Sequence, residues 1–210
     1  MLSNFQPDYY VYTDGACSNN GRKNAKAGIG IFLGQDDIRN VDEVVEGKQS
    51  NNTAELTAII KSWPIIKNDI INGKKIMIVS DSIYAIRCVS SYGEKCAQNF
   101  WKKDIPNKEL VKIGYEIYKD NDNVQFMHIK AHTDNQDVHS IGNDGADKLA
   151  NKAIGLDNCP YIGPEKIYLN VPFAKKDKVK SLGGRWDTNK KQWYIFDDNT
   201  NKDNILETYS

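Results

Sequence analysis

Apolar and polar positions alternate in three short runs near the start of the chain, which predicts β-strands. The runs cover residues 10–15, 27–34 and, more weakly, 41–48, and residues that favour turns separate them. Strands joined by short turns pair with their sequence neighbours in opposite directions. The first part of the chain is therefore predicted to form an antiparallel meander.

The second of these runs carries glycines on only one of its two faces. Ile29, Ile31 and Leu33 share one face, and Gly28 and Gly30 share the other. A strand glycine often marks a place where another element approaches the backbone closely. We therefore expect a helix or strand to pack tightly on the glycine face.

The hydrophobic period then changes from two residues to between three and four. Over residues 52–68 the apolar positions follow the stripe of an amphipathic helix: Leu56, Ile59, Ile60 and Trp63. Asn51 or Asn52 is the expected N-cap. Pro64 removes one backbone hydrogen bond, so we expect a kink or a helix end there.

Later runs continue the alternation of strands and helices. Residues 75–80 form a nearly continuous apolar strand, as is typical of a strand buried on both faces. The further expected elements are a short helix after Asp81, a helix over 107–120, a strand over 124–129, a polar loop over 131–142 and a final helix. This order predicts an α/β fold, with a mixed sheet flanked by helices.

Composition restricts the class of protein more than its function. Hydrophobic residues make up 40% of the 210 residues, charged residues make up 27%, and the net charge is zero. No stretch approaches the roughly 20 apolar residues of a membrane span, and the first residues lack the pattern of a signal peptide. The four cysteines form no CxxC pair. We expect a cytoplasmic or nuclear protein that is not secreted and has no membrane partner.

Four acids stand at comparable places in the predicted elements: Asp14, Glu55, Asp81 and Asp147. Two end strands and two lie on helices beside the apolar stripe, so all four are expected to point toward the sheet. Crowded carboxylates favour a hard cation such as Mg²⁺ or Mn²⁺. Taken singly, each acid could also serve as a turn residue, a capping residue or a surface charge.

The sequence around these acids resembles that of type 1 ribonuclease H, and the resemblance covers residues 8–154. The matching stretches are Thr-Asp-Gly-Ala at 13–16, Asn-Gly at 20–21, Asn-Asn-Thr-Ala-Glu-Leu at 51–56, Val-Ser-Asp-Ser at 79–82 and Gly-Asn-Asp-Gly-Ala-Asp at 142–147. The resemblance implies a ribonuclease H-like five-stranded sheet, with three antiparallel strands followed by parallel ones. It also implies that the four acids are metal ligands.

The same resemblance implies an endonuclease that hydrolyses the RNA strand of RNA/DNA hybrids. The implied cofactor is a pair of Mg²⁺ ions, for which Mn²⁺ can substitute, and the products would carry 5′-phosphate and 3′-hydroxyl ends. Asp14 would bridge the two ions. His132, in the loop before the last helix, would assist proton transfer or product release.

Residues expected to bind the substrate follow from the resemblance as well. Asn20, Asn51 and Asn52 match positions that contact the 2′-hydroxyl or the minor-groove base edges, although turn and cap roles remain possible for them. Further matches lie along the path of the DNA strand: Lys48, Ser50, Tyr84, Tyr92 and Asn107. Tyr92 stands where tryptophan is common in the family, which puts substrate affinity in question.

The last part of the chain is predicted to be a separate small α+β domain. We divide the chain into a catalytic domain at 1–154, a linker at 155–164 and an accessory domain at 165–210. Positions 166–191 hold eight Lys or Arg and two Asp, a net charge of +6, with Trp186 among them and Trp193 shortly after. This part resembles a small uncharacterised domain that is often appended to DNA-handling proteins.

Candidate nucleic-acid contacts of this accessory domain are Lys175, Lys176, Arg185, Trp186 and Trp193. The alternative is that the tryptophans form the core of the domain and the charges are merely solvated. For the whole chain, two rivals to the hybrid nuclease remain: a non-catalytic hybrid- or single-strand-binding protein, and a DNA-cutting nuclease on the same fold. The expected partner is an RNA/DNA hybrid bound by a monomer.

Overall fold

The computed structural model describes residues 5–130, 137–156, 166–187, 190–196, 199 and 201–209, without the side chains of 166, 196 and 203. Contacts divide the chain into two compact units, Met1–Asn158 and Cys159–Ser210. Each unit is described by itself below. None of the described helices is long and apolar enough to cross a membrane.

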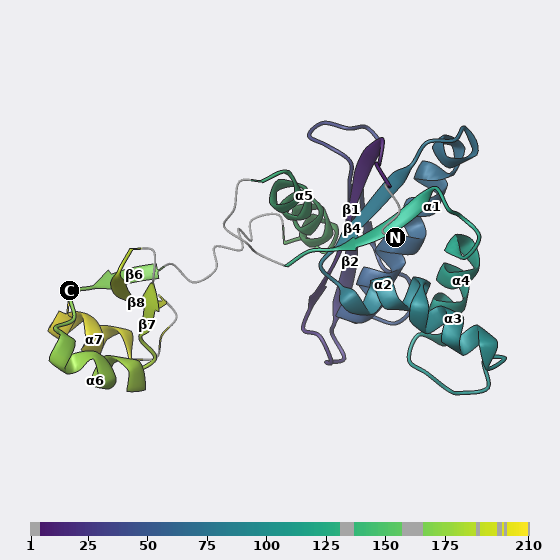
Figure 1. Cartoon of the computed structure of the whole chain (residues 1–210). Coiled ribbons are helices and arrows are strands. Elements are labelled where there is room, and N and C mark those ends of the chain that lie inside the picture. Colours follow the sequence, from purple (N-terminus) through teal and green to yellow (C-terminus); the bar gives the residue numbers. More distant parts are fainter. Residues whose placement is uncertain are drawn as a thin grey trace. The chain divides into compact units, whose positions relative to one another are not determined.

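A five-stranded mixed sheet forms the centre of the first unit (Figure 1). Its strands are β1 (Tyr9–Ser18), β2 (Lys26–Phe32), β3 (Val41–Val44), β4 (Ile76–Ser80) and β5 (Val124–His128), in the spatial order β3-β2-β1-β4-β5. The pairs β1–β2 and β2–β3 are antiparallel, whereas β1–β4 and β4–β5 are parallel. The predicted fold class is confirmed.

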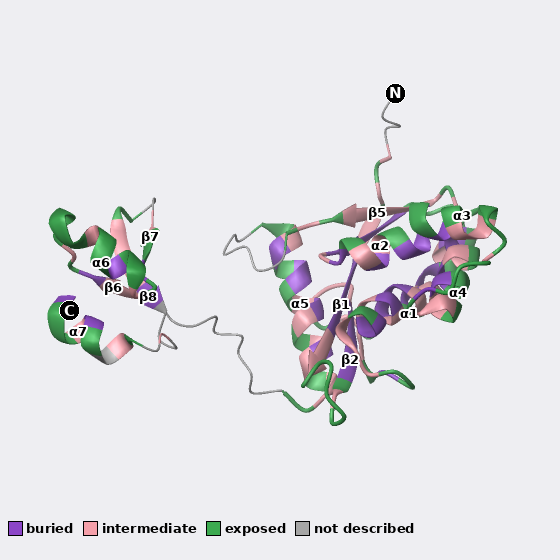
Figure 2. Cartoon of the chain, turned by 90° about the horizontal axis from the view of Figure 1, so that it is seen from below, coloured by how far each residue is buried: buried purple, intermediate pink, exposed green. Residues whose placement is uncertain are grey.

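Helices cover both faces of this sheet (Figure 2). They are α1 (Asn51–Ile71), α2 (Ile83–Val89), α3 (Ser91–Gln98), α4 (Lys108–Tyr118) and α5 (Val138–Ala153). The larger core joins α1, α2 and α4 to one face and includes fully buried Val11, Leu56 and Ile78. On the opposite face, α5 packs on β1 and β2. The sheet thus lies between α5 and the layer that contains α1.

The glycine face of β2 packs against α5, as predicted. A Cβ atom on Gly30 would lie 1.9 Å from the carbonyl oxygen of Ala146, and one on Gly28 would lie 2.6 Å from that of Ala150. These distances are far below ordinary contact, so only glycine allows this approach. The close packing brings the backbone of α5 against the sheet beside β1.

Several element boundaries differ from the predictions. β1 continues to Ser18 because residues 15–18 still pair with β2, so the prediction that Asp14 ends this strand was wrong. β3 ends at Val44 and not near residue 48.

Ser50 is the N-cap of α1, because its extended backbone and its Oγ acceptor meet the Thr53 amide; the prediction of Asn51 or Asn52 was wrong. The helix also continues through Pro64 to Ile71, because buried residues follow the proline on the core face. α5 begins at Val138, inside the predicted loop, because Asp137 accepts hydrogen bonds from two amides of its first turn.

The second unit contains a three-stranded antiparallel sheet in the order β6-β8-β7. Its elements are β6 (Lys166–Leu169), the 3₁₀ turn η1 (Phe173–Lys175), α6 (Lys176–Ser181), β7 (Arg185–Asp187), β8 (Gln192–Phe196) and α7 (Lys202–Tyr209). Its core joins both helices to the sheet and contains Leu169, Val179, Ile195, Ile205 and Tyr209. The predicted first strand is shorter than expected, and sequence reasoning missed β7 and α7.

Candidate active site

Asp14 lies near the middle of β1 with a side chain that is only 8% exposed. The Gly15 amide donates to its Oδ1 at 2.6 Å. In the antiparallel register Asp14 is paired with Gly30, so both residues face α5. Gly15 faces the other way, since a Cβ there would lie 2.3 Å from the Glu55 amide of α1. β1 is therefore the point at which α1 and α5 both approach the sheet.

Burial raises the pKa of Asp14 well above its usual range, and nearby negative charge adds to this effect. Asp81, Asp147 and Glu55 all raise this pKa, whereas the hydrogen bond from Gly15 lowers it. The four predicted acids therefore act on one another electrostatically. Because the folded state disfavours the Asp14 anion, folding stability falls as pH rises from the usual value of 3.8 through the raised pKa.

Two neutral donors hold the carboxylate of Glu55. The Ser82 hydroxyl donates to Oε2, and Asn51 Nδ2 donates to Oε1 at 2.7 Å. Burial raises the pKa of Glu55, and the charge of Asp81 adds to it, while the bond from Ser82 acts in the opposite direction. Ser82 is also the N-cap of α2. It therefore fixes Glu55 of α1 to the end of β4.

Asp81 directly follows β4, and Asp147 lies on α5. Asn143, which is 2% exposed, donates from Nδ2 to Asp81 Oδ2 at 3.4 Å. Asn151 donates to Asp147 Oδ1 at 2.9 Å and to its carbonyl oxygen at 3.0 Å. These amides orient the two acids without removing their charge. Sequence reasoning missed Asn143, although it lies in the Gly-Asn-Asp-Gly stretch.

The donor chemistry of these residues fits a magnesium-type cation. All four offer hard carboxylate oxygens, and the charges of Asp81, Asp147 and Glu55 add to the burial that disfavours the Asp14 anion. Within the described residues, no three acidic, histidine or cysteine side chains form a ready-made metal cage. Mg²⁺ does not need one, because it usually keeps several waters and binds through one or two carboxylates together with substrate phosphates.

A chain of hydrogen bonds joins three of the predicted substrate-binding residues. Ser50 Oγ lies 2.6 Å from Thr53 Oγ1, which donates to Asn107 Oδ1 at 3.2 Å. Asn107 Nδ2 in turn donates to the Tyr84 hydroxyl at 3.2 Å. Thr53 is the residue that sequence reasoning missed, although it lies within the Asn-Asn-Thr-Ala-Glu stretch. The network connects the starts of α1, α2 and α4.

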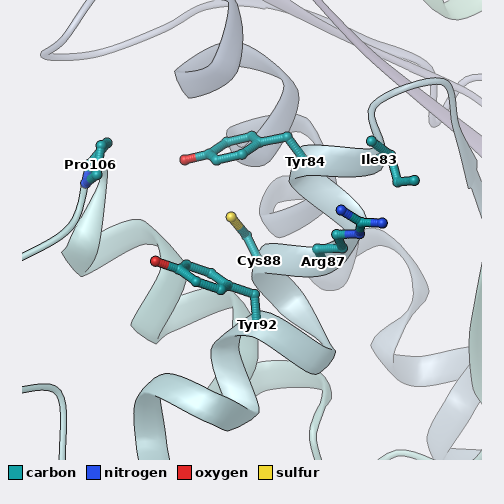
Figure 3. A pocket seen from close by; sticks show the side chains of 6 residues that line it. All are labelled: Ile83, Tyr84, Arg87, Cys88, Tyr92 and Pro106. Carbon is teal, nitrogen blue, oxygen red and sulfur yellow. The ribbon is translucent and has the colours of Figure 1, made fainter. Parts of the chain in front are cut away.

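Tyr84 and Tyr92 line one cavity of about 280 Å³ beside this network (Figure 3). Arg87, Cys88 and Pro106 also line it, and Figure 3 shows the two tyrosine rings on either side of the Cys88 thiol. Tyr92 is 36% exposed. Burial raises the pKa of the Tyr84 hydroxyl to about 12, so Tyr84 is neutral at physiological pH. The cavity therefore offers two aromatic rings and one guanidinium group.

Among the remaining predicted residues, Asn20, Lys48 and Asn52 lie near the start of α1. Asn20 Oδ1 accepts from the Asn51 amide at 3.3 Å, so the loop after β1 contacts the start of α1. Lys48 and Asn52 are exposed near the same helix end. His132 lies outside the described residues, as does Cys159; the other three cysteines are free thiols.

The predicted contacts of the second unit lie in η1, at the start of α6, on the edge strand β7 and on the central strand β8. Lys175 is in η1 and Lys176 begins α6. Arg185 and Trp186 are exposed on β7, whereas Trp193 on β8 packs partly against the core. The alternative interpretation, that the tryptophans form the core of this domain, is therefore right in part for Trp193 and wrong for Trp186.

Comparison with known families assigns both units. The family model described as RNase H matches residues 6–155, and a domain of unknown function (DUF5710) matches residues 166–205. The first match covers more than half of the chain and contains all four acids.

Curated relatives and solved structures agree with that match. "Ribonuclease H1" of Mus musculus is 36% identical over 144 residues, which cover 67% of this chain and 48% of that protein. "Ribonuclease H" of Clostridium botulinum is 31% identical over 149 residues, covering 69% of this chain and 93% of that protein. The chain thus spans about half the length of the first of these relatives.

The solution structure of the PFV RNase H domain superimposes with a TM-score of 0.57 at 22% identity. The match covers 70% of this chain and 94% of that one, and at this identity it shows the fold alone.

Proposed function

This chain belongs to the RNase H family, and from that premise we propose that it hydrolyses the RNA strand of RNA/DNA hybrids. We propose further that it does so with two divalent cations and leaves 5′-phosphate and 3′-hydroxyl ends. The observation that carries the proposal is a buried Asp14 whose pKa is raised by burial and by Asp81, Asp147 and Glu55. Such an arrangement costs stability unless a cation neutralises it.

Asp14, Glu55, Asp81 and Asp147 would hold the cations. Two bound cations would activate a water for in-line attack and stabilise the leaving 3′-oxygen. The chain's own part is to hold the four carboxylates in place and correctly oriented. The backbone amide of Gly15 performs this for Asp14.

The neutral residues around the acids act as positioning residues in this proposal. Ser82 and Asn51 hold both oxygens of Glu55, so that its carboxylate cannot rotate freely. Asn143 performs the same function for Asp81. A misplacement of about 1 Å in such a group can cost roughly 100-fold in rate.

For the substrate, we propose that the two strands of the hybrid lie on different residues. Asn20, Asn51 and Asn52 would contact the RNA strand, because an amide both donates and accepts and so suits a 2′-hydroxyl. The DNA strand would contact Lys48, Ser50, Asn107, Tyr84 and Tyr92. The hydrogen-bonded network through Thr53 supports this second set, since it fixes three of these side chains together.

We keep His132 as a residue that assists proton transfer or product release. A His132→Ala variant should change the pH dependence of turnover more than it changes hybrid affinity. A pH–rate profile that keeps the wild-type shape would refute this role.

Cleavage by the purified full chain tests the proposal directly. The labelled substrates are a hybrid, an RNA duplex and a DNA duplex of the same sequence, each with Mg²⁺ or with a chelator. We expect cleavage of the hybrid's RNA strand only, with Mg²⁺ only. Mass spectrometry of the fragments should find 5′-phosphate and 3′-hydroxyl ends.

Asp14→Asn should abolish this cleavage and leave hybrid binding largely intact. Asp122→Asn is the matched control, because it makes the same change at an exposed turn residue away from the site. Retained cleavage by Asp14→Asn would refute the site assignment. Equal cleavage of the DNA duplex would favour the rival DNA-cutting function, and hybrid binding without cleavage would favour the binding protein.

A further inference from the structure

The second unit carries an aromatic pair on β7, an edge strand, and β8, the central strand of its sheet. Trp186 of β7 and Trp193 of β8 are direct cross-strand partners, with ring centroids 5.6 Å apart and an interplanar angle of 63°. Trp193 packs partly against the core, but Trp186 is 49% exposed. Core packing therefore explains Trp193, whereas Trp186 packs on the Trp193 ring and leaves about half of its surface exposed.

A cavity of about 490 Å³ lies against this pair. Its walls combine the two indoles with Pro172, and its polar lining comes from Asn170, Lys191 and Gln192. This combination suits an unpaired base. The rings offer a stacking surface, the two amides can bond the edges of the base, and the ammonium can bind the adjoining phosphate. A volume of this size accommodates a base.

Lys191 lines the cavity, and further basic residues lie on the segments next to its lining. Positions 166–191 have a net charge of +6, although the whole chain is neutral. Lys175, Lys190 and Lys191 are exposed. Next to Pro172, Phe173 is 81% exposed, and Lys176 Nζ lies 4.2 Å from the centroid of its ring. An exposed ring with a cation on it provides a second aromatic surface near the first.

We propose that this surface binds single-stranded nucleic acid, with one unpaired base in the cavity against Trp186 and the neighbouring phosphates on Lys191 and the lysines of η1 and α6. The basic charge selects a polyanion. The exposed rings select one whose base faces are free, which excludes an intact duplex because its bases are already stacked. The proposal concerns the second unit and does not depend on the function proposed for the first.

The test measures the affinity of the full chain for a labelled dT oligomer of about 15 nucleotides by fluorescence anisotropy over a salt series. An rU oligomer of equal length distinguishes DNA from RNA. An abasic oligomer of the same length keeps the phosphates and removes the bases. Far-UV circular dichroism checks the fold of each variant.

Trp186→Ala should weaken dT binding about tenfold, since base–aromatic stacking contributes an amount of that order. Trp186→Phe should give an intermediate value, and the abasic oligomer should bind the wild type as weakly as dT binds Trp186→Ala. Lys191→Glu should weaken binding and reduce its salt dependence. Two matched controls lie on the first unit: Ile38→Ala, which removes a 99% exposed apolar side chain, and Lys67→Glu.

Wild-type affinity of Trp186→Ala would overturn the proposal. Equal affinity for dT and the abasic oligomer would also overturn it, because the surface would then bind charge alone. An equal loss for Lys67→Glu and Lys191→Glu would show that net charge, not this surface, governs binding. If Trp186→Ala does not fold, Trp186→Phe and the abasic oligomer still decide the outcome.

Discussion

Gly30→Ala tests whether the contact between β2 and α5 positions the acidic centre. The new Cβ would lie 1.9 Å from Ala146 O, where ordinary contact begins at 3.4 Å, so the backbones must separate by about 1.5 Å. Neither neighbour is a flexible side chain, since the next contact is the Ala150 amide nitrogen at 2.7 Å. The displacement moves α5, which carries Asp147, away from the strand that pairs with Asp14.

Gly30→Ala should affect the stability of the fold less than the rate of cleavage. Overpacking of this kind typically costs about 1–3 kcal/mol, which corresponds to a fall in melting temperature of roughly 2–12 °C for a domain of this size. A shift of about 1 Å in a catalytic group can cost on the order of 100-fold in rate. Activity should therefore fall far more than the folded fraction at 25 °C.

Gly34→Ala is the matched control, because a Cβ at Gly34 meets nothing within 4 Å and its φ is ordinary. The assay combines hybrid cleavage at saturating substrate with a thermal melt of both variants. A Gly30→Ala enzyme with the cleavage rate of Gly34→Ala would refute the reasoning. Unfolding of Gly30→Ala at the assay temperature would instead show that the contact holds the fold.

Three further predictions concern the acids and their donors. With a chelator at neutral pH, the Asp14→Asn variant should have a higher melting temperature than the wild type. This difference in melting temperature should vanish as pH falls toward about 4, because Asp14 of the wild type is then protonated. Ser82→Ala should lower the melting temperature by roughly 2–4 °C through loss of a helix cap worth about 1 kcal/mol, and should reduce cleavage more than tenfold by releasing Glu55. Asn143→Asp should prevent cleavage and lower the melting temperature, because it puts a second carboxylate beside Asp81; an unchanged melt would refute this.

The meander and the position of Asp81 at the end of β4 were predictable from local pattern, whereas Asp14 lies inside β1 and not at its end. Apolar alternation and the glycine face of β2 together indicated both the meander and the close packing of α5. A carboxylate at the end of a buried strand can still reach solvent. Asp81 directly follows the apolar strand β4, so its position indicated a candidate site residue. The family resemblance then ordered the acids into one site.

Residues that hold the acids were not predictable in this way. Asn143 and Asp81 are 62 positions apart, and Ser82 and Glu55 are 27 apart. Periodicity identifies which face of a helix is apolar, but not which polar residue at its edge will meet which strand end. The same limit explains why the N-cap of α1 was predicted wrongly. Ser50 caps the helix, whereas the side chain of Asn51 holds Glu55.

The choice of donors around the acids carries a functional argument. Within the described part of the chain, Asp14, Glu55 and Asp81 form no ion pair with Lys or Arg. Their hydrogen bonds come from a backbone amide, a hydroxyl and side-chain amides. Neutral donors fix the direction of a carboxylate, whereas a lysine or arginine would also neutralise it and would compete with a cation for the same oxygens. The fold therefore tolerates the burial and the repulsion that raise the pKa of Asp14, and it leaves the oxygens of Asp14, Glu55 and Asp81 open to a cation.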